Sequence, residues 1–253
     1  MQPIQIFNHA VNMLTADTNM TFKVLLLPIL LSIVAAMIAG AILLGGPLAW
    51  FDQSNMEVQI ASGRMNWGGF VLVLILSAIF WLWGAVAWHR YVLLDETPTG
   101  FMPKFNGNRM LAYLGWGILI GLVISLIVIV FGLLTAALAF LGTAGIFIGT
   151  ALTTVAAMVL WLGLSSILPG VASGKSVGFG AAFSKVFENF GMLLVLAIIF
   201  AAISMIPSVI VELTGSSFLI ALVNILVQIV VGSIILSTMT TLYGMWFEGR
   251  RLD

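Results

Sequence analysis

The chain has 253 residues, of which 62% are hydrophobic and only 7% are charged, and its mean hydropathy is +1.21. Soluble domains carry about 25% charged residues, so this composition excludes a soluble globular fold. The charges of nine basic and nine acidic side chains cancel, so the chain has no net positive charge that would attract nucleic acid. The absence of cysteine excludes disulfides and thiolate metal sites. We therefore expect an integral membrane protein.

An amphipathic segment opens the chain. Between residues 3 and 19, Ile4, Phe7, Val11 and Leu14 share one helix face, and polar side chains occupy the rest. This pattern predicts a short helix that lies in the membrane interface, or a similar helix docked on the bundle. The first twenty residues contain neither Lys nor Arg, so we expect no cleavable signal peptide.

Six long apolar stretches follow, each able to cross a hydrocarbon core of ~30 Å as a helix. They predict spans over residues 22–44, 68–94, 110–140, 146–168, 192–211 and 218–247. The third is longer than a perpendicular helix needs, so we expect it to tilt or to break near Gly132. A polar loop over residues 45–67 separates the first two spans, and a second amphipathic stretch at 179–189 precedes the fifth. The sequence thus predicts an all-α fold and one membrane domain, 1–253, in which six transmembrane helices are accompanied by two short interfacial amphipathic helices.

Small residues recur at four-residue spacing in three of these stretches. Such pairs let a neighbouring helix approach closely, and we expect packing within the chain rather than a dimer. The pairs are Ala36-xxx-Gly40, Gly117-xxx-Gly121 and Gly145-xxx-Gly149.

The basic residues are strongly biased to one side of the predicted bundle. With six spans, that side holds Lys23, Arg90, Lys104, Arg109, Lys175, Lys185, Arg250 and Arg251. The other side holds only Arg64. Cytoplasmic loops carry the excess of Lys and Arg, so the pattern predicts that both termini lie in the cytoplasm. Tyr113 and the other two tyrosines fall on the same side, as expected of interfacial anchors.

The densest group of titratable residues lies at the end of the second span. One interpretation is a small polar site, with imidazole as acid or base, guanidinium as an anion clamp and carboxylates as partners. The alternative is that the arginines are topology anchors and that the acids pair with them. The candidate residues are His89, Arg90, Asp95, Glu96, Arg109 and Glu248.

A second polar group lies within the sixth span. Asn224 and Gln228 are four residues apart near its middle, and serines and threonines continue from Ser233 to Thr241. These side chains either line a pathway or form interhelical hydrogen bonds. The two histidines are too far apart for metal-ligand spacing, and no nucleophile or phosphate-loop motif is present, so we expect no catalytic residue, metal or cofactor.

Four segments of the chain resemble known proteins. AVAWHRYVLLDE, the RMLAYLGW start of the third span and the terminal TTLYGMWFEGR are similar to a group of uncharacterised bacterial multi-span inner-membrane proteins. The stretch ILPGVASGKSVGFGAAFSKVFENFGMLLVL is more loosely similar to the membrane domain of glycerophosphodiester phosphodiesterases. The resemblance implies six helices with interfacial lead-ins and a location in a bacterial inner membrane, and it implies no established activity.

Three classes of function remain open. A structural, assembly or accessory subunit that binds another integral membrane complex or lipids comes first, because the other classes lack the residues that they require. A transporter or lipid-handling conduit is the alternative; the span cores contain no charged residue, so we expect no proton coupling. A membrane enzyme acting on a phosphorylated lipid headgroup is the third class, and the sequence does not favour an enzyme.

Overall fold

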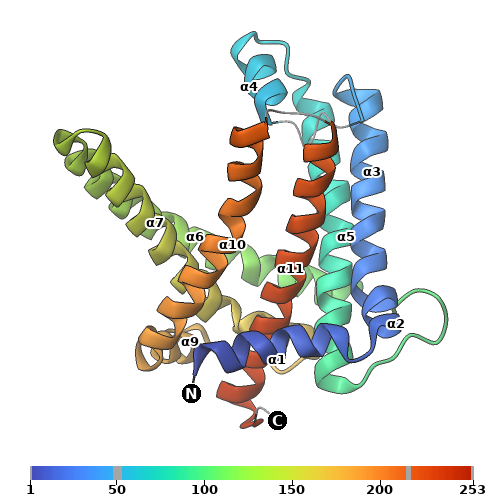
Figure 1. Cartoon of the computed structure of the whole chain (residues 1–253). Helices are drawn as coiled ribbons and strands as arrows, with labels where there is room; N and C mark the ends of the chain where they lie inside the picture. The colour runs from blue at the N-terminus through green and yellow to red at the C-terminus, as the bar shows by residue number, and fades with distance from the viewer. Residues whose placement is uncertain (1, 48–52, 215–217, 252–253) are drawn as a thin grey trace.

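The computed structural model describes residues 2–47, 53–214 and 218–251, apart from the side chains of 53–55, 205, 207–214, 218–222 and 224. Over these residues the chain consists of helices joined by turns and has no strand, which confirms the all-α prediction (Figure 1). Five helical stretches are long and apolar enough to cross a membrane: Thr18–Leu43, Trp67–Leu94, Gly107–Leu141, Thr143–Ser173 and Ile225–Phe247. A bent pair, Phe179–Glu188 with Phe190–Ser204, makes a sixth if it is counted as one span. The chain is a multi-pass membrane protein.

The first span is built from three pieces. α2 (Thr18–Thr21) is capped by Asp17, whose carboxylate accepts a hydrogen bond from the Met20 amide at 3.0 Å. A π-helical turn over Phe22–Leu26 leads into α3 (Leu27–Leu43). This wider turn comes directly before Pro28, whose ring nitrogen has no hydrogen to donate to the preceding turn.

α3 packs along α5 (Trp67–Leu94) and forms the first helical hairpin. The connection predicted as a polar loop contains a short helix, α4 (Gln53–Ala61). Ala36 is buried in an apolar cluster with Val73 of α5, as the small-residue spacing predicted. Gly40 serves a different purpose, because a Cβ there would stand 3.0 Å from the carbonyl oxygen of Gly46 in the turn after α3.

The second hairpin, which we call the arm, consists of α6 (Gly107–Leu138), a 3₁₀ turn (Ala139–Leu141) and α7 (Thr143–Ser165). Figure 1 shows the arm leaving the bundle obliquely, away from α10 and α11, in agreement with the predicted tilt. The predicted break near Gly132 is wrong, since α6 continues through it. A lone glycine weakens a helix by only about 1 kcal/mol, which is not enough to interrupt an apolar span.

The glycine pairs of the arm have different surroundings. A Cβ at Gly145 would stand 1.8 Å from the carbonyl oxygen of Leu138, and one at Gly149 would stand 2.8 Å from Cβ of Thr135. These two glycines therefore bring α7 against the end of α6, as predicted. Gly117 and Gly121 have no atom within 4 Å of such a Cβ, so the expectation of close packing is wrong for them.

The fourth span does not end at Leu168, because the chain bends at Ser166 and continues as α8 (Ile167–Ser173), which has Pro169 in its first turn. α9 (Phe179–Glu188) is the second amphipathic helix; it buries Ala182 and Val186 and meets α10 (Phe190–Thr214) at an angle of 87°. α11 (Phe218–Phe247) is the last helix.

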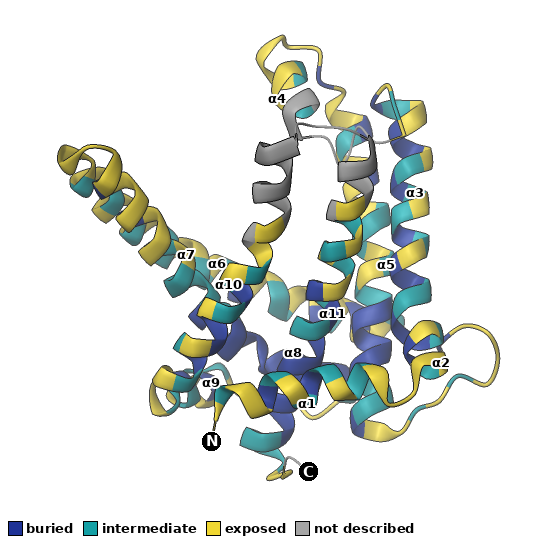
Figure 2. Ribbon diagram, in the orientation of Figure 1, coloured by how far each residue is buried: buried dark blue, intermediate teal, exposed yellow. Residues whose placement is uncertain are grey.

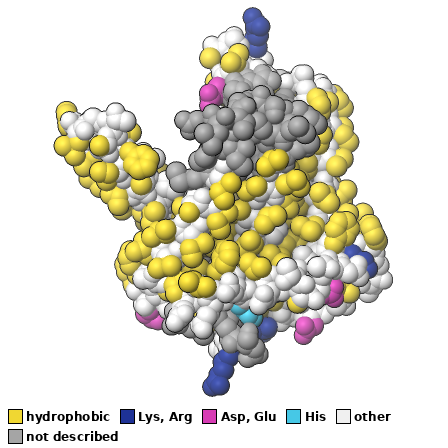
Figure 3. Space-filling model, viewed as in Figure 1, with side chains coloured by type: hydrophobic (Ala, Val, Ile, Leu, Met, Phe, Trp, Pro, Cys, Tyr) yellow, Lys and Arg dark blue, Asp and Glu magenta, His cyan; other side chains and the backbone are white. Residues whose placement is uncertain are grey.

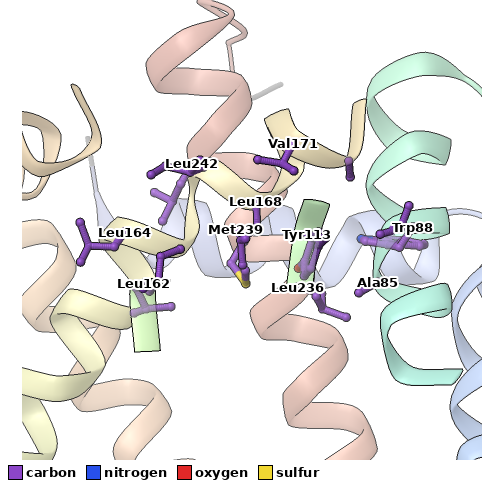
Figure 4. Packing of buried hydrophobic residues seen from close by; sticks show 14 of the residues in the cluster. Ala85, Trp88, Tyr113, Leu162, Leu164, Leu168, Val171, Leu236, Met239 and Leu242 are labelled. Carbon is purple, nitrogen blue, oxygen red and sulfur yellow. The ribbon is translucent and has the colours of Figure 1, made fainter. Parts of the chain in front are cut away.

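The core lies toward the end of the bundle where α5 and α11 finish. Buried residues concentrate there in Figure 2, around α8 and the adjoining turns of α5 and α11. Figure 4 shows Tyr113 of α6 between Met239 of α11 on one side and Ala85 and Trp88 of α5 on the other. The first amphipathic helix, α1 (Pro3–Thr15), lies across α10 and α11 and buries Ile6 and Ala10.

Charged side chains lie at the two ends of the molecule. On the face drawn in Figure 3, hydrophobic side chains cover the middle, and Lys, Arg, Asp and Glu appear above and below it. Both termini lie at the same end, beside α1 (Figure 1). We call this the basic end, because every Lys and Arg except Arg64 belongs to a segment that reaches it.

Candidate functional site

Four helix ends converge at the basic end. They meet at the last two residues of α8 and the turn after them, Ala172–Lys175. We call this segment the α8 turn. It is sharp because Gly174 has a left-handed backbone, with φ of +88°, and the amide of Lys175 donates to the carbonyl of Gly170 at 2.8 Å. Gly170 itself must be small, since a Cβ there would stand 2.5 Å from the ring of Tyr243.

Arg90 connects the end of α5 to the α8 turn. Its Nε donates to Glu96 Oε2 at 2.7 Å, and its Nη2 also contacts this carboxylate oxygen. Its Nη1 donates to the carbonyl of Ala172 at 3.0 Å. The last carbonyls of a helix lack partners within it and carry partial negative charge, so a guanidinium at this position stabilises α8.

Arg109 and Asp95 take less central positions. The guanidinium of Arg109 lies over Gly174, where a Cβ would stand 2.8 Å from Nη2. This contact brings the start of α6 to the same turn. Asp95 is exposed and ends α5 with a left-handed backbone, φ of +53°.

Glu248 joins the end of α11 to this cluster. It accepts a hydrogen bond from Lys175 Nζ at 3.1 Å and another from Arg250 Nε at 2.8 Å. Arg250 in turn donates from Nη2 to the carbonyl of Leu93, at 3.1 Å, and thereby caps α5. Neither Lys175 nor Arg250 was predicted as a site residue; the signal available was a cation shortly after each helix end.

His89 points away from the charged cluster and into the core. It is completely buried, with Nδ1 2.8 Å from Thr240 Oγ1 and Nε2 3.1 Å from the Tyr113 hydroxyl. Thr240 also donates to the carbonyl of Leu236, so we assign the hydrogen of the neutral imidazole to Nδ1, where it donates to Thr240. Nε2 then accepts from Tyr113. One imidazole thus joins α5, α6 and α11.

This placement corrects the expectation for Tyr113. Tyr113 was predicted to lie at the membrane interface, but it is only 2% exposed. Its ring is stacked on that of His89, with the ring centroids 5.6 Å apart. Ala85 and Leu93, four residues from His89 on either side, are buried on the same helix face. Val86 and Leu94 stand at the same spacing from Arg90 and are equally apolar, so no pattern in the sequence singled out His89 as the buried one.

The structure brings four of the six predicted residues to the α8 turn, namely Arg90, Glu96, Arg109 and Glu248. His89 and Asp95 do not join them. A hollow of about 560 Å³ opens beside the turn, lined by Lys175, Tyr243 and Glu248 among others. Arg90, Glu96, Lys175, Glu248 and Arg250 are engaged with one another or with helix carbonyls, whereas the guanidinium of Arg109 makes no hydrogen bond or ion pair to another described residue. The described residues include no cluster of His, Asp and Glu that would hold a metal ion. The arrangement therefore fits helix-end anchors better than an anion clamp.

The polar side chains of the last span are bonded mostly within their own helix. Ser233, Thr238 and Thr241 each donate to the carbonyl four residues earlier, at 2.7–2.9 Å. The prediction of interhelical hydrogen bonds is wrong for these three, and Thr240 alone among those with described bonds reaches another helix. Gln228 is exposed, and the side chain of Asn224 lies outside the described residues.

Comparison of this chain with protein-family models, with curated proteins and with solved structures finds no match. The resemblance to uncharacterised inner-membrane proteins therefore stays a prediction from the quoted segments.

Proposed function

We propose that this protein is an accessory or assembly subunit that binds another integral membrane complex through its arm. One observation carries the proposal. Only 6% of the most apolar stretch of Gly107–Leu141 is buried, against 22% to 50% in the other four spans. The buried residues of α6, Met110, Tyr113 and Ile120, all lie in its first half.

The geometry of the arm supports a protein partner rather than lipid alone. Its first helical stretch has 35 residues and is about 52 Å long, at about 1.5 Å per residue. Fitting that length into ~30 Å of hydrocarbon needs a tilt of about 55°, beyond the range of up to about 40° seen for membrane helices. Tilt is set by packing against neighbouring helices, and among the described residues α7 is the helix that α6 contacts most, while the buried side chains of α6 stop at Ile120. A partner protein would supply the missing packing (Figure 2).

The other two classes of function find less support. A polar pathway along α11 would need hydroxyls turned toward an open space, whereas those of Thr238 and Thr241 are buried and bonded to their own helix. A headgroup enzyme would need several unengaged charges in one place, whereas Arg90 and Glu248 are each held by two partners and, of the candidate residues at the α8 turn, Arg109 alone has no described side-chain partner.

We further propose that the basic end faces the cytoplasm of a bacterial inner membrane. The support is the bias of eight basic residues against one, counted over the loops and helix ends of the predicted six spans. The partner complex and the surrounding lipids would then meet the arm within the membrane.

The chain is free of cysteine, so one introduced cysteine carries a photo-crosslinker at a single known place. Leu126→Cys places it on the outer half of α6, where the native side chain is 65% exposed. Ile38→Cys on α3, where the native side chain is 58% exposed, is the matched control. In native membranes we expect a discrete protein adduct from Leu126→Cys and lipid adducts from Ile38→Cys.

Three results of this experiment would overturn the proposal. Adducts of the same mass from both positions would mean random collision, and lipid adducts alone would mean that the arm faces lipid. Adducts that contain only a second copy of this chain would mean self-association instead of binding to another complex.

A further inference from the structure

A hollow of about 450 Å³ lies where α3, α5, α6, α7 and α8 meet, on the membrane-facing side of the core. Its walls are mainly apolar and include Trp81 of α5, Ile118 of α6, Trp161 of α7 and Leu168 of α8. This volume falls within the range of roughly 300–1,000 Å³ that is usual for small-molecule sites. Such sites add a few placed polar groups to an apolar lining, and this hollow has them.

Ser77 supplies the decisive polar atom. Its Oγ is buried and has no hydrogen-bond partner among the described residues, although Ser77 lines the hollow. Serine and threonine within a helix commonly donate to the carbonyl four residues earlier, as Thr238 and Thr241 do here. Ser32, on the facing helix, donates instead to the backbone carbonyl of Ser77 at 3.1 Å. The Ser77 hydroxyl therefore remains an unused donor in an apolar setting.

Tyr113 forms a rigid part of the same wall. Its ring is almost completely buried, and its hydroxyl is held by His89 Nε2 at 3.1 Å. The hollow consequently has one fixed aromatic wall and does not depend on a mobile side chain for its shape.

The depth of Ser77 restricts the ligand. In α5, which spans residues 67–94, Ser77 comes 10 residues after the first and 17 before the last, so it lies about 5 Å from the helix midpoint. The charged headgroup of a phospholipid stays at the surface, about 15 Å from the midplane of a ~30 Å core. Because the ester carbonyls lie next to the headgroup, a phospholipid cannot offer its oxygen to Ser77 without burying that charge.

We propose that this hollow binds a neutral lipophilic molecule with a carbonyl or hydroxyl oxygen, which accepts a hydrogen bond from Ser77 Oγ once rotation of the side chain turns that buried atom into the hollow. The molecule carries no charged headgroup, and its apolar body lies between the two indole-bearing walls. Both a membrane-soluble ketone or quinone and a neutral glyceride have this chemistry. The site is separate from the outer half of the arm, so it does not depend on the function proposed above.

Benzophenone is a suitable probe, because it is a neutral diaryl ketone whose carbonyl both accepts a hydrogen bond and reacts with nearby C–H groups under light. The full chain in phosphatidylcholine nanodiscs would be photolabelled and the modified residues mapped by mass spectrometry. We expect labelling to concentrate on the α3, α5 and α6 segments around Ser77, Leu82 and Ile118. Diphenylmethane has the same shape as benzophenone but lacks the oxygen. It should therefore bind the hollow more weakly, and an excess of it should reduce the labelling by benzophenone only slightly.

Two glycines of α6 provide a matched pair of variants. Gly117 lines the hollow, Gly121 does not, and a Cβ at either position meets no atom within 4 Å. Gly117→Leu should fill the hollow and abolish labelling without disturbing the fold, whereas Gly121→Leu should label like the native chain. Ser77→Ala should weaken benzophenone binding about fivefold, the effect of losing one neutral hydrogen bond.

Competition with decylubiquinone and with dioleoylglycerol identifies the source of the ligand, and displacement by either one supports the site. The proposal is overturned if Gly117→Leu labels as strongly as Gly121→Leu, if labelling spreads evenly over all lipid-facing helices, or if neither competitor displaces the probe.

Discussion

Tyr113→Phe tests whether His89 is the point that joins three helices. The change keeps the ring and removes only the hydroxyl that donates to Nε2, so a buried acceptor loses its partner. Such a loss costs about 1–3 kcal/mol in proteins, and single interhelical hydrogen bonds within membranes contribute about 0.6 and at most about 1.7 kcal/mol. We expect the free energy of unfolding to fall by about 1–2 kcal/mol.

A double-mutant cycle with His89→Leu gives the decisive number. Once the imidazole is gone, Tyr113→Phe should cost less, and the coupling energy should be about 1 kcal/mol. Unfolding would be followed by circular dichroism as SDS is added to mixed micelles. Tyr91→Phe is the control, since its hydroxyl makes no hydrogen bond to another described residue. Additivity within about 0.3 kcal/mol, or a loss no larger than that of Tyr91→Phe, would refute the role assigned to His89.

Three further predictions concern the basic end, the arm and sidedness. Arg90→Ala should lower the free energy of unfolding by about 1–3 kcal/mol in the same assay, because Glu96 and the Ala172 carbonyl lose a charged donor. Arg90→Lys should restore less than half of that lost free energy. Full restoration would contradict the contact of one guanidinium with both groups. Gly149→Leu should separate α6 from α7 and cost about 2 kcal/mol or more, seen as a lower thermal midpoint, while an unchanged midpoint would contradict the close approach. A reporter active only in the cytoplasm and fused after Asp253 should give signal, and signal from a periplasm-active reporter instead would reverse the proposed sidedness.

The spans were largely predictable because hydropathy depends on composition rather than on tertiary contacts. The predicted span 68–94 agrees with Trp67–Leu94, whose ends are marked by the Asn66 cap, which accepts from the Gly69 amide at 2.9 Å, and by the left-handed Asp95. The continuation through Pro169 was not predictable. Proline is tolerated in the first turn of a helix, and whether a helix stops or restarts there depends on packing.

The sequence predicted on which side of the membrane the candidate site residues lie, but not the direction in which each side chain points from its helix. His89 and Arg90 are neighbours in sequence, yet adjacent residues on a helix point about 100° apart, so one enters the core and the other reaches the α8 turn. Ala85, four residues before His89, and Val86, four residues before Arg90, are both buried, so the apolar neighbours do not decide which of the two directions faces the core. The α8 turn itself depends on close contacts of Gly170 and Gly174, which no periodicity in the sequence reveals.

The short connection at the tip of the arm affects how this hairpin is inserted into the membrane during synthesis. Residues 110–174 contain no Asp, Glu, Lys, Arg or His, and Gly142 alone separates the 3₁₀ turn from α7. Insertion of this hairpin during synthesis therefore carries no hydrophilic segment across the bilayer. With the basic end in the cytoplasm, as proposed, the α3–α5 hairpin must instead translocate a connection that holds α4 and Arg64. The two hairpins thus make different demands on the insertion machinery, and the arm can enter the bilayer as a preformed pair of helices.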